Sequence, residues 1–525
     1  MSSILSKKLV YKRMHLLSEN NLIQNACAAG KMRPIFPAAH NLLAIRRFLE
    51  YNTKKKRGDP KAIRTKIMAN KAVTMDKLVA LCKARGIIFP GSEIYGGMGN
   101  TWDYGPVGVE IKNNVKRAWW KRFVQESDNS YGVDAAILMN ARVWEASGHT
   151  ASFSDPKMDC KNCKSRHRAD NLIEAHSKGK VNPDLMTNEE MEAYINEHHV
   201  CCPVCGKCDW TPIRTFNLMF ETSRGVTDES QNKIYLRPET AQGEFVNFLN
   251  VQRTTRAKVP FGIAQIGKAF RNEITPGNFI FRTIEFEQME HQWFCKEGTD
   301  SAYYAQFKER AWQFLLDLGF NPEHLRFHDH DKLAHYAKEA CDIQYEFPMG
   351  WNELNGIHNR TDYDLSRHQE YSGKSLTYID PVSGEKYIPY VIEYSIGADR
   401  LMLAILSEAY DEETLENGEV RNVMHFHPAI AAYKAAVLPL QKNLAAPAKE
   451  LLAKLKKHFS VTYDEAGSIG KRYRRQDEIG TPYCLTIDFT TLEDGTVTVR
   501  DRDSMEQVRM NADEVISFLT QKCAF

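Results

Sequence analysis

The chain has 525 residues, of which 43% are hydrophobic, 10% aromatic and 26% charged. This composition is typical of a globular protein and excludes a disordered or fibrous chain, and the length predicts two or three domains. The formal net charge is only +2, and no stretch reaches the roughly 18 consecutive apolar residues of a membrane-spanning helix. We therefore expect no membrane partner.

The N-terminal region is strongly basic. Residues 1–74 hold 16 Lys or Arg and 3 Asp or Glu, so the rest of the chain is acidic. The extension at 1–67, with the run KKKR at 54–57, is interpreted as an arm that contacts a nucleic acid, a targeting segment, or a translated region upstream of a start at Met68 or Met75. Twelve cysteines without a secretory signal indicate a reducing compartment. The expected location is the cytoplasm, or an organelle if the extension is a targeting segment.

An amphipathic helix is predicted directly after Gly105-Pro106, because proline fits the first turn of a helix. Apolar residues recur there at every fourth position: Val107, Ile111, Val115, Trp119 and Phe123. This spacing places them on one helix face, which either the domain core or a dimer partner has to cover.

Several β-rich runs lie between residues 215 and 405, including 261–266 and 281–286. Their polar turns predict a mainly antiparallel sheet with flanking helices.

From about residue 425 the pattern changes. Apolar or β-rich runs at 435–440, 483–487 and 496–500 and a helix-like stretch at 448–459 predict a separate α/β domain. The acidic segment 411–419 is the expected linker.

Two Cys-x-x-Cys pairs indicate a metal site. Cys160, Cys163, Cys202 and Cys205 have the spacing with which two short turns hold one tetrahedral ion, and zinc is the ion that takes four sulfurs. Cys201, Cys208, His198 and His199 leave the ligand set open. The role of such a closed site is structural.

A second cluster of charged residues lies at 270–273 (FRNE) and 281–286 (FRTIEF), on either side of a Pro-Gly turn at 276–277. A hairpin there places two arginines and an aromatic ring around one ligand. Guanidinium groups bind phosphate oxygens in pairs and stay charged, so the ligand expected is a nucleotide with a polyphosphate.

These segments resemble a known family. Residues 265–273 (QIGKAFRNE) resemble motif 2 of the class II aminoacyl-tRNA synthetases, 393–401 (EYSIGADRL) resemble motif 3, and the helix after Gly105-Pro106 resembles motif 1. Within the class, 236–243 (LRPETAQG) and 351–357 (WNELNGI) are similar to the glycyl enzymes of the homodimeric type. The resemblance extends from about residue 75 to the C-terminus.

The resemblance implies an α+β fold and the ATP-dependent attachment of glycine to tRNA(Gly) through a glycyl-adenylate, with Mg²⁺ on the ATP, in a homodimer. It implies catalytic roles for Arg271, Glu273 and Arg400. The residues implied in ATP binding are Arg271, Asn272, Glu273, Phe281, Arg282, Phe286, Glu353, Leu354, Gly397 and Arg400.

The resemblance also implies a glycine site. Its residues are Arg168, Glu239, Glu290, Glu393, Ser395 and Gly397. Carboxylates hold the ammonium group there, and steric overlap rejects larger amino acids. Motif 3 has Tyr394 and Ile396 where many relatives carry smaller residues, which leaves the fine shape of the pocket open but not its class.

The C-terminal domain at 425–525 resembles the anticodon-binding domain of the glycyl, histidyl, prolyl and threonyl enzymes. Basic residues alternate with Tyr473 in the segment 470–476, which suits phosphate contact and base stacking on a single-stranded loop. The residues expected to bind tRNA are Lys471, Arg472, Arg474 and Arg475.

The expected domains are the extension (1–67), the first part of the catalytic domain (68–155), a Cys-rich insertion (156–212), the catalytic core (213–415) and the anticodon-binding domain (425–525). Two other interpretations are a non-catalytic relative, which the presence of Arg271, Glu273 and Arg400 disfavours, and a synthetase for threonine or proline, which the segment around Glu239 disfavours.

Overall fold

The computed structural model describes residues 73–525, except 179, 184–185, 225–231, 274–276, 331–332 and 335. The basic extension expected at 1–67, Met68 and the Pro276 of the expected turn lie outside the described residues. The chain divides into two compact units, 1–71 and 72–525, and all of the described residues belong to the second. Among the described helices, none combines the length and apolar character that a membrane crossing needs.

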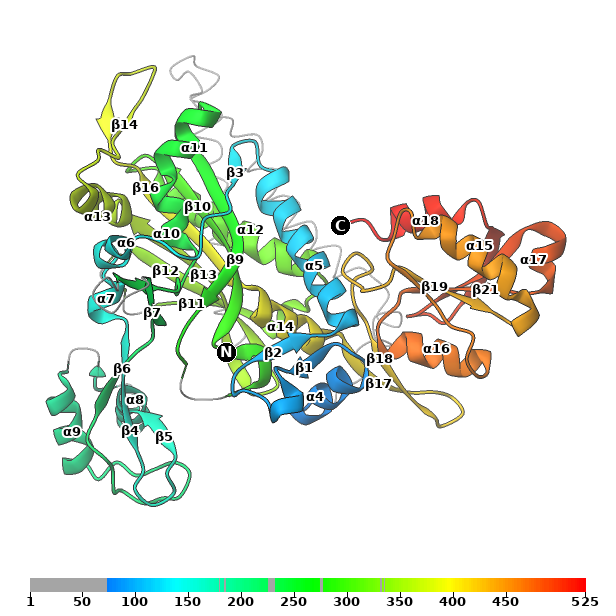
Figure 1. The fold of residues 1–525 in the computed structure, drawn as a ribbon, viewed down its shortest axis with the longest axis horizontal. Coiled ribbons are helices and arrows are strands. Elements are labelled where there is room, and N and C mark those ends of the chain that lie inside the picture. Colours follow the sequence, from blue (N-terminus) through cyan, green and yellow to red (C-terminus); the bar gives the residue numbers. More distant parts are fainter. Residues whose placement is uncertain are drawn as a thin grey trace, which may run out of the picture. The chain divides into compact units, whose positions relative to one another are not determined.

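A seven-stranded sheet forms the centre of the catalytic region (Figure 1). In spatial order its strands are β11 (Leu325–Asp329), β12 (Glu339–Phe347), β13 (Gly350–Thr361), β16 (Tyr390–Gly397), β10 (Glu285–Cys295), β9 (Phe261–Phe270) and β3 (Ser130–Gly132). Every neighbouring pair is antiparallel except β3 and β9. This confirms the predicted fold class.

Side chains alternate between the two faces of this sheet, as the pleat requires. Met289, Tyr394 and Ile396 point into the largest core, whose helices are α5 (Pro106–Trp120), α12 (Asp300–Asp317) and α14 (Ala398–Ala409). Phe294 and Val391, at alternate positions, belong to a second core. Its helices are α10 (Ala241–Val246), α11 (Phe248–Thr255) and α13 (Tyr363–Ser372).

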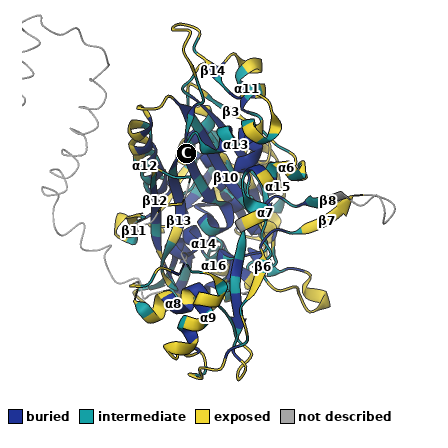
Figure 2. Ribbon diagram, turned by 90° about the vertical axis from the view of Figure 1, so that its left-hand side faces the viewer, coloured by how far each residue is buried: buried dark blue, intermediate teal, exposed yellow. Residues whose placement is uncertain are grey.

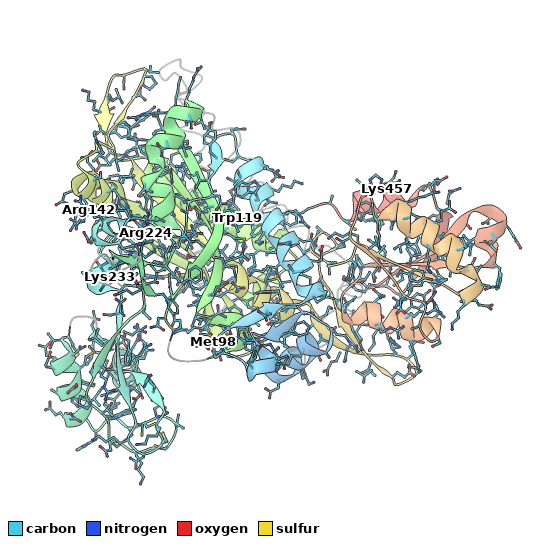
Figure 3. The ribbon with its side chains drawn as sticks, viewed as in Figure 1. Met98, Trp119, Arg142, Arg224, Lys233 and Lys457 are labelled. Carbon is cyan, nitrogen blue, oxygen red and sulfur yellow. A yellow bond between two sulfur atoms is a disulfide. The ribbon has the colours of Figure 1, made fainter. Side chains whose placement is uncertain are left out.

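The apolar stripe predicted after Gly105-Pro106 lies on α5 and continues into the π-helical turn η2 (Lys121–Gln125). All five of its residues are buried in the largest core. Trp119, labelled in Figure 3, and Phe123 stack on Tyr394 of β16. The domain core of the same chain therefore covers this helix face, and the stripe gives no evidence for a dimer.

The prediction of a strand at 281–286 is wrong except for its last two residues, Glu285 and Phe286. Phe279–Phe281 form a 3-10 turn, η5, whose three side chains are buried in the largest core, and β10 begins only at Glu285. The strand expected at 261–266 is confirmed as part of β9, which pairs with β10 as a hairpin.

Shorter elements complete the region. They are α4 (Met75–Ala84), β1 (Ile88–Pro90), η1 (Glu93–Tyr95), β2 (Trp102–Tyr104), α6 (Ala141–Ala146), α7 (His149–Ser152), β7 (Glu221–Arg224), β8 (Asn232–Tyr235), η6 (Pro322–His324), β14 (Tyr378–Ile379) and β15 (Lys386–Tyr387). Strand β7 of the β7–β8 hairpin is exposed (Figure 2), whereas Tyr235 of β8 is buried; Arg224 and Lys233 lie on this hairpin (Figure 3).

The Cys-rich segment has a small core of its own. A three-stranded sheet, in the order β5 (Arg166–Arg168), β4 (Ser154–Asp159) and β6 (Arg214–Asn217), packs with α8 (Ala169–Ser177), and α8 packs against α9 (Asn188–Glu197).

The C-terminal region is an α/β domain with a five-stranded mixed sheet. Its strands, in spatial order, are β20 (Val461–Tyr463), β19 (Ala435–Pro439), β21 (Tyr483–Ile487), β22 (Thr496–Asp501) and β23 (Gln507–Asn511). Its helices are η7 (Lys442–Leu444), α15 (Ala445–Leu455), α16 (Ile469–Glu478), α17 (Phe489–Asp494) and α18 (Val515–Lys522). The runs expected at 435–440, 483–487 and 496–500 are thus confirmed as strands, and that at 448–459 lies mainly in α15.

The linker expected at 411–419 is instead part of a β-hairpin, β17 (Tyr410–Thr414) with β18 (Val420–Met424). Arg421 of β18 is fully buried and lies 3.3 Å from a carboxylate oxygen of Asp477 on α16. Acidic composition predicted a solvated connection, but alternate side chains such as Val423 are buried and hold the segment in place.

Candidate active site

A cavity of about 250 Å³ lies over the ends of β10, β13 and β16 and the start of α14. Twelve of the residues expected to bind ATP or glycine line it: Glu239, Arg271, Glu273, Phe281, Arg282, Phe286, Glu290, Glu353, Glu393, Ser395, Gly397 and Arg400. The strand alternation explains part of this set. Glu393, Ser395 and Gly397 occupy every second position of β16 and so face the same side.

One part of the cavity is cationic. The Arg271 guanidinium lies over the Phe286 ring, 5.5 Å from its centroid, and that of Arg400 lies over the Phe281 ring at 4.5 Å. Arg282 has 41% of its side chain exposed. Three guanidinium groups that converge on one cavity can bind several phosphate oxygens at once, and aromatic rings beside them suit a nucleobase.

The other part is acidic, and Glu290 lies in it with 3% of its surface exposed. Its carboxylate accepts hydrogen bonds from the hydroxyl of Ser395 at 2.8 Å, from the amide of Gln288 at 3.1 Å, and from the hydroxyl of Thr240. Burial, and then the charges of Glu393 and Glu239, raise the pKa of Glu290 to about 7. Glu290 thus changes charge near neutral pH.

Glu393 is buried but stays ionised. Burial opposes ionisation, but the Arg360 guanidinium at 3.1 Å and the His358 ring at 2.9 Å outweigh it and lower the pKa of Glu393 to about 2. The amide of Gln292 donates a third hydrogen bond at 3.0 Å. A fixed negative charge therefore faces the cavity.

Glu239 provides a second fixed charge. Burial acts against its ionisation, but His149, 3.4 Å away, together with Arg360 and Gln242 keeps the pKa of Glu239 well below its usual range. Two ionised carboxylates and a third that titrates near pH 7 form an anionic site that suits a small ammonium group, next to the arginines of the cationic part.

Comparisons with known proteins agree with this geometry. Residues 220–409 match the family model of the tRNA synthetase class II core domain (G, H, P, S and T), and 434–522 match that of the anticodon binding domain. Glycine–tRNA ligases of Clostridium kluyveri and Clostridium perfringens are 61% and 62% identical over 458 and 462 residues, which is 86% of this chain and 99% of theirs. That of Geobacillus kaustophilus is 60% identical over its whole length and 86% of this chain.

The chain belongs to the glycine–tRNA ligase family. A solved structure described as the RNA binding domain of threonyl-tRNA synthetase from Cryptosporidium parvum is similar in fold alone, with a TM-score of 0.58, 15% identity, and 85% of this chain and 98% of that one covered. The family assignment confirms the predicted class II core, the anticodon-binding domain and the activity.

Sequence reasoning missed several residues of this family's cavity. The additional lining residues are Ile280, Thr283, Gln288, Tyr336, Gly356, His358, Arg360 and Asp399. Gly356, His358 and Arg360 occupy alternate positions of β13, directly after the segment 351–357, so the two-residue period of a strand is a signal for them.

Asp399 joins the helices of motifs 1 and 3 in this ligase fold. It accepts hydrogen bonds from Lys112 of α5 at 2.8 Å, from Tyr104 at 2.5 Å and from the backbone amide of Glu287. Asp399 also precedes Arg400 in the first turn of α14. The contact therefore fixes the helix that carries one of the phosphate-facing arginines.

Three residues expected in the site do not line the cavity. Leu354 is buried in the largest core, on the opposite side of β13 from Glu353. Arg168 forms ion pairs at 2.8 Å with Asp155 and 2.5 Å with Asp170, within the Cys-rich segment. Asn272 donates its backbone amide to the carbonyl of Leu218.

The unusual motif 3 residues also face away from the cavity. Tyr394 and Ile396 are buried in the largest core. Along β16 they alternate with Glu393, Ser395 and Gly397, which line the cavity. Neither side chain lines the cavity, since the pleat turns both to the other face of the sheet.

The two Cys-x-x-Cys pairs do come together. The four Sγ atoms of Cys160, Cys163, Cys202 and Cys205 all lie within 4.8 Å of one another, with 3.6 Å between Cys160 and Cys205 and 3.7 Å between Cys163 and Cys202. Four sulfurs about 2.3 Å from a tetrahedral zinc ion are about 3.8 Å apart, so the donor set fits zinc. The other two cysteines of this segment, Cys201 and Cys208, are joined by a disulfide.

The basic segment expected to contact tRNA forms α16, and two of its residues belong to the domain interior. Arg472 is only 3% exposed and donates to the carbonyl oxygens of Pro439 and Leu440 at 2.5 and 3.4 Å. The hydroxyl of Tyr473 bonds that of Thr486, and the Arg500 guanidinium covers its ring. The expected phosphate contact by Arg472 and base stacking by Tyr473 therefore do not fit this ligase.

Proposed function

We propose that the cavity is where the chain activates glycine with ATP before transferring it to tRNA(Gly). The observation that carries this proposal is the convergence of three guanidinium groups and three buried carboxylates on one cavity. Membership in the glycine–tRNA ligase family supports it. Activation forms a glycyl-adenylate and pyrophosphate, and transfer to the terminal adenosine of the tRNA completes the reaction.

The cationic part of the cavity binds ATP in this proposal. Arg271 holds the α-phosphate together with the glycine carboxylate, Arg282 and Arg400 bind the γ-phosphate, and Phe286 stacks on adenine. In-line attack of the carboxylate places charge on five-coordinate phosphorus, which fixed cations stabilise without a proton-transferring base. Glu273, Phe281 and Gly397, which also line the cavity, complete the ATP site.

Mg²⁺ accompanies the ATP and neutralises part of the phosphate charge. Glu353 lies 3.1 Å from Arg400 and has 50% of its side chain exposed, so its carboxylate can reach a ligand in the cavity. Carboxylate oxygens are the protein ligands that Mg²⁺ takes. Glu353 would therefore hold the ion on the phosphates.

The acidic part of the cavity binds glycine. Glu239, Glu290 and Glu393 surround the ammonium group, while Ser395 and Gly397 lie beside the α-carbon; Arg168 completes the expected set. A side chain on the substrate would overlap with these groups, and overlap is a stronger filter than the energy of a missing methylene.

The activity is tested by ATP–pyrophosphate exchange with each of the amino acids in turn. We expect exchange with glycine only. Exchange with threonine or proline would overturn the substrate, and exchange with no amino acid would favour a non-catalytic relative.

The titration of Glu290 predicts a pH dependence of glycine binding. Since its pKa is raised to about 7, Glu290 is neutral below and ionised above that pH, and only the ionised form attracts the glycine ammonium. The KM for glycine should therefore fall as the pH rises from 6 to 8, in exchange assays at saturating ATP. Glu290→Gln should give a higher KM without this pH dependence. A flat profile in the unaltered protein would contradict the assignment.

The anticodon-binding domain contacts the tRNA in this proposal, and of the residues expected there Lys471 and Arg474 are the two that no described hydrogen bond holds. Arg475 is already bound to Asp464 at 2.6 Å. Replacing Lys471 and Arg474 by alanine should weaken tRNA binding and flatten its log–log salt dependence, by about 0.7 to 0.9 for each phosphate that is no longer bound. Titration of tRNA at several salt concentrations measures both. Lys456→Ala with Lys457→Ala is the matched control; an unchanged slope in the α16 variant would exclude its phosphate contacts.

Further parts of the proposal rest on the family resemblance and on the cysteine cluster. They are a structural zinc ion on Cys160, Cys163, Cys202 and Cys205, a homodimer, a cytoplasmic location and the five-part division of the chain. Light scattering tests the dimer, for which a species of about 60 kDa would be contrary evidence.

A further inference from the structure

A buried carboxyl group lies next to the acidic part of the cavity without a partner. Glu244, on α10, is 0% exposed, and neither of its oxygens has a hydrogen-bond partner among the described residues. An unpaired carboxylate in the protein interior is costly, and buried polar groups are nearly always hydrogen-bonded. Glu244 is therefore expected either to be protonated or to bond a nearby polar atom that has no other hydrogen-bond partner.

The charged groups around Glu244 disfavour its ionised form. Burial, and then the charges of Glu290 on β10 and Glu393 on β16, raise the pKa of Glu244 well above its usual range, and Arg237 offsets only part of this. Full burial without a hydrogen-bond partner and the neighbouring charges thus both favour the protonated form of Glu244. In that state its O–H is a hydrogen-bond donor, whereas the ionised carboxylate can only accept.

A matching acceptor is present on Gln292, whose backbone amide the Glu244 carboxyl faces. The Gln292 side chain is also 0% exposed. Its Nε2 donates to Glu393 at 3.0 Å, but its Oε1 has no donor among the described residues. Glu244 and Gln292 thus lie on two elements that pack together, α10 and β10, and each has a buried side-chain oxygen without a partner among the described residues.

We propose that Glu244 is a positioning residue for glycine, whose O–H donates to Oε1 of Gln292 and thereby keeps Nε2 of Gln292 on Glu393. An amide side chain has two similar orientations, and a donor to its oxygen selects the one that presents its nitrogen to the carboxylate. Without that donor, the amide can turn its oxygen toward Glu393. This inference rests on the proposed role of Glu393 in binding the glycine ammonium.

The ionisation of Glu244 has an opposite effect to that of Glu290. Loss of its proton removes the donor and adds a negative charge beside Glu290 and Glu393. Glycine binding should therefore weaken once Glu244 ionises. Glu244→Gln keeps a donor to Gln292 and does not ionise, so it should lack this loss.

The experiment uses the full-length protein and glycine-dependent ATP–pyrophosphate exchange from pH 6 to pH 9. Glu244→Leu removes the donor at similar size. It should raise the KM for glycine about tenfold, the usual effect of removing one hydrogen bond, with kcat and the KM for ATP within about twofold. Glu244→Gln should match the unaltered chain at neutral pH.

Thermal unfolding and a double-mutant cycle separate positioning from folding. If Glu244→Leu melts no earlier than the unaltered chain, its raised KM for glycine cannot come from unfolding. In a Gln292→Leu background, Glu244→Leu should have no further effect on the KM, because the two residues act as a unit.

Three results would overturn the inference: an unchanged KM for glycine in Glu244→Leu, equal losses in Glu244→Gln and Glu244→Leu, or additive effects with Gln292→Leu. In each of these the unaltered chain still shows glycine-dependent exchange, so the proposed function stands. Absence of that exchange in the unaltered chain would overturn both.

Discussion

Arg271→Ala and Arg400→Ala are each expected to reduce glycine-dependent pyrophosphate exchange by a few hundredfold or more. Each change removes a fixed cation aimed at the reacting phosphates, and the loss of one such preorganised interaction costs about 3 to 4 kcal/mol. Both substitutions should leave the protein folded. Arg271 donates to a single carbonyl oxygen, that of Pro238, and Arg400 pairs with the half-exposed Glu353.

The matched control for these arginines is Arg253→Ala, on the exposed surface of α11 and outside the cavity. It should retain normal exchange. Circular dichroism of all three variants shows whether a loss of rate comes from the site or from unfolding. Near-normal exchange in the Arg271 or Arg400 variant would remove that residue from the mechanism.

Removal of the metal is the second change with a large expected effect. Protein purified without chelator should carry one zinc ion per chain, and Cys163→Ser should lose it. Structural zinc contributes about 10 to 16 kcal/mol of apparent folding free energy in zinc-finger peptides at neutral pH. The small core around Met158, Ile173 and Trp210 is too limited to replace it, so the segment between β4 and β6 should become susceptible to protease.

Elemental analysis measures the zinc content, and limited proteolysis measures the order of the segment. Cys523→Ser, a free cysteine in the C-terminal domain, is the control and should retain both zinc and protease resistance. An absence of zinc in the unaltered protein, or a Cys163→Ser variant as resistant as the control, would show that the four thiols do not hold an ion.

The sequence alone predicted the elements whose pattern is local. The four-residue period after Gly105-Pro106 predicted α5, and the β-rich runs at 483–487 and 496–500 predicted β21 and β22. Short motifs predicted most of the cavity. Half of the twelve predicted residues lie on β10, β16 and the start of α14, where the strand and helix periods already determine which side chains share a face.

Only the tertiary structure decided what covers each face. An apolar stripe with a four-residue period looks the same in the sequence whether the domain core or a second chain packs on it. The packing of Trp119 and Phe123 against Tyr394 showed that the domain core covers it. The basic run in α16 likewise predicts an exposed helix face, whereas in the structure Arg472 is buried against backbone carbonyl oxygens.

The partners of the buried charged groups could not be predicted from the sequence either, because they are distant along the chain. Asp399 meets Lys112 across 287 residues, and the charges of Glu290 and Glu393 act on Glu244 from other strands. Periodicity assigns a side chain to a face, but its pKa and its hydrogen bonds depend on which groups the fold brings to that face. For this chain, the sequence predicted most of the residues that line the cavity, and the packing of distant strands and helices decided how each of them is charged and held.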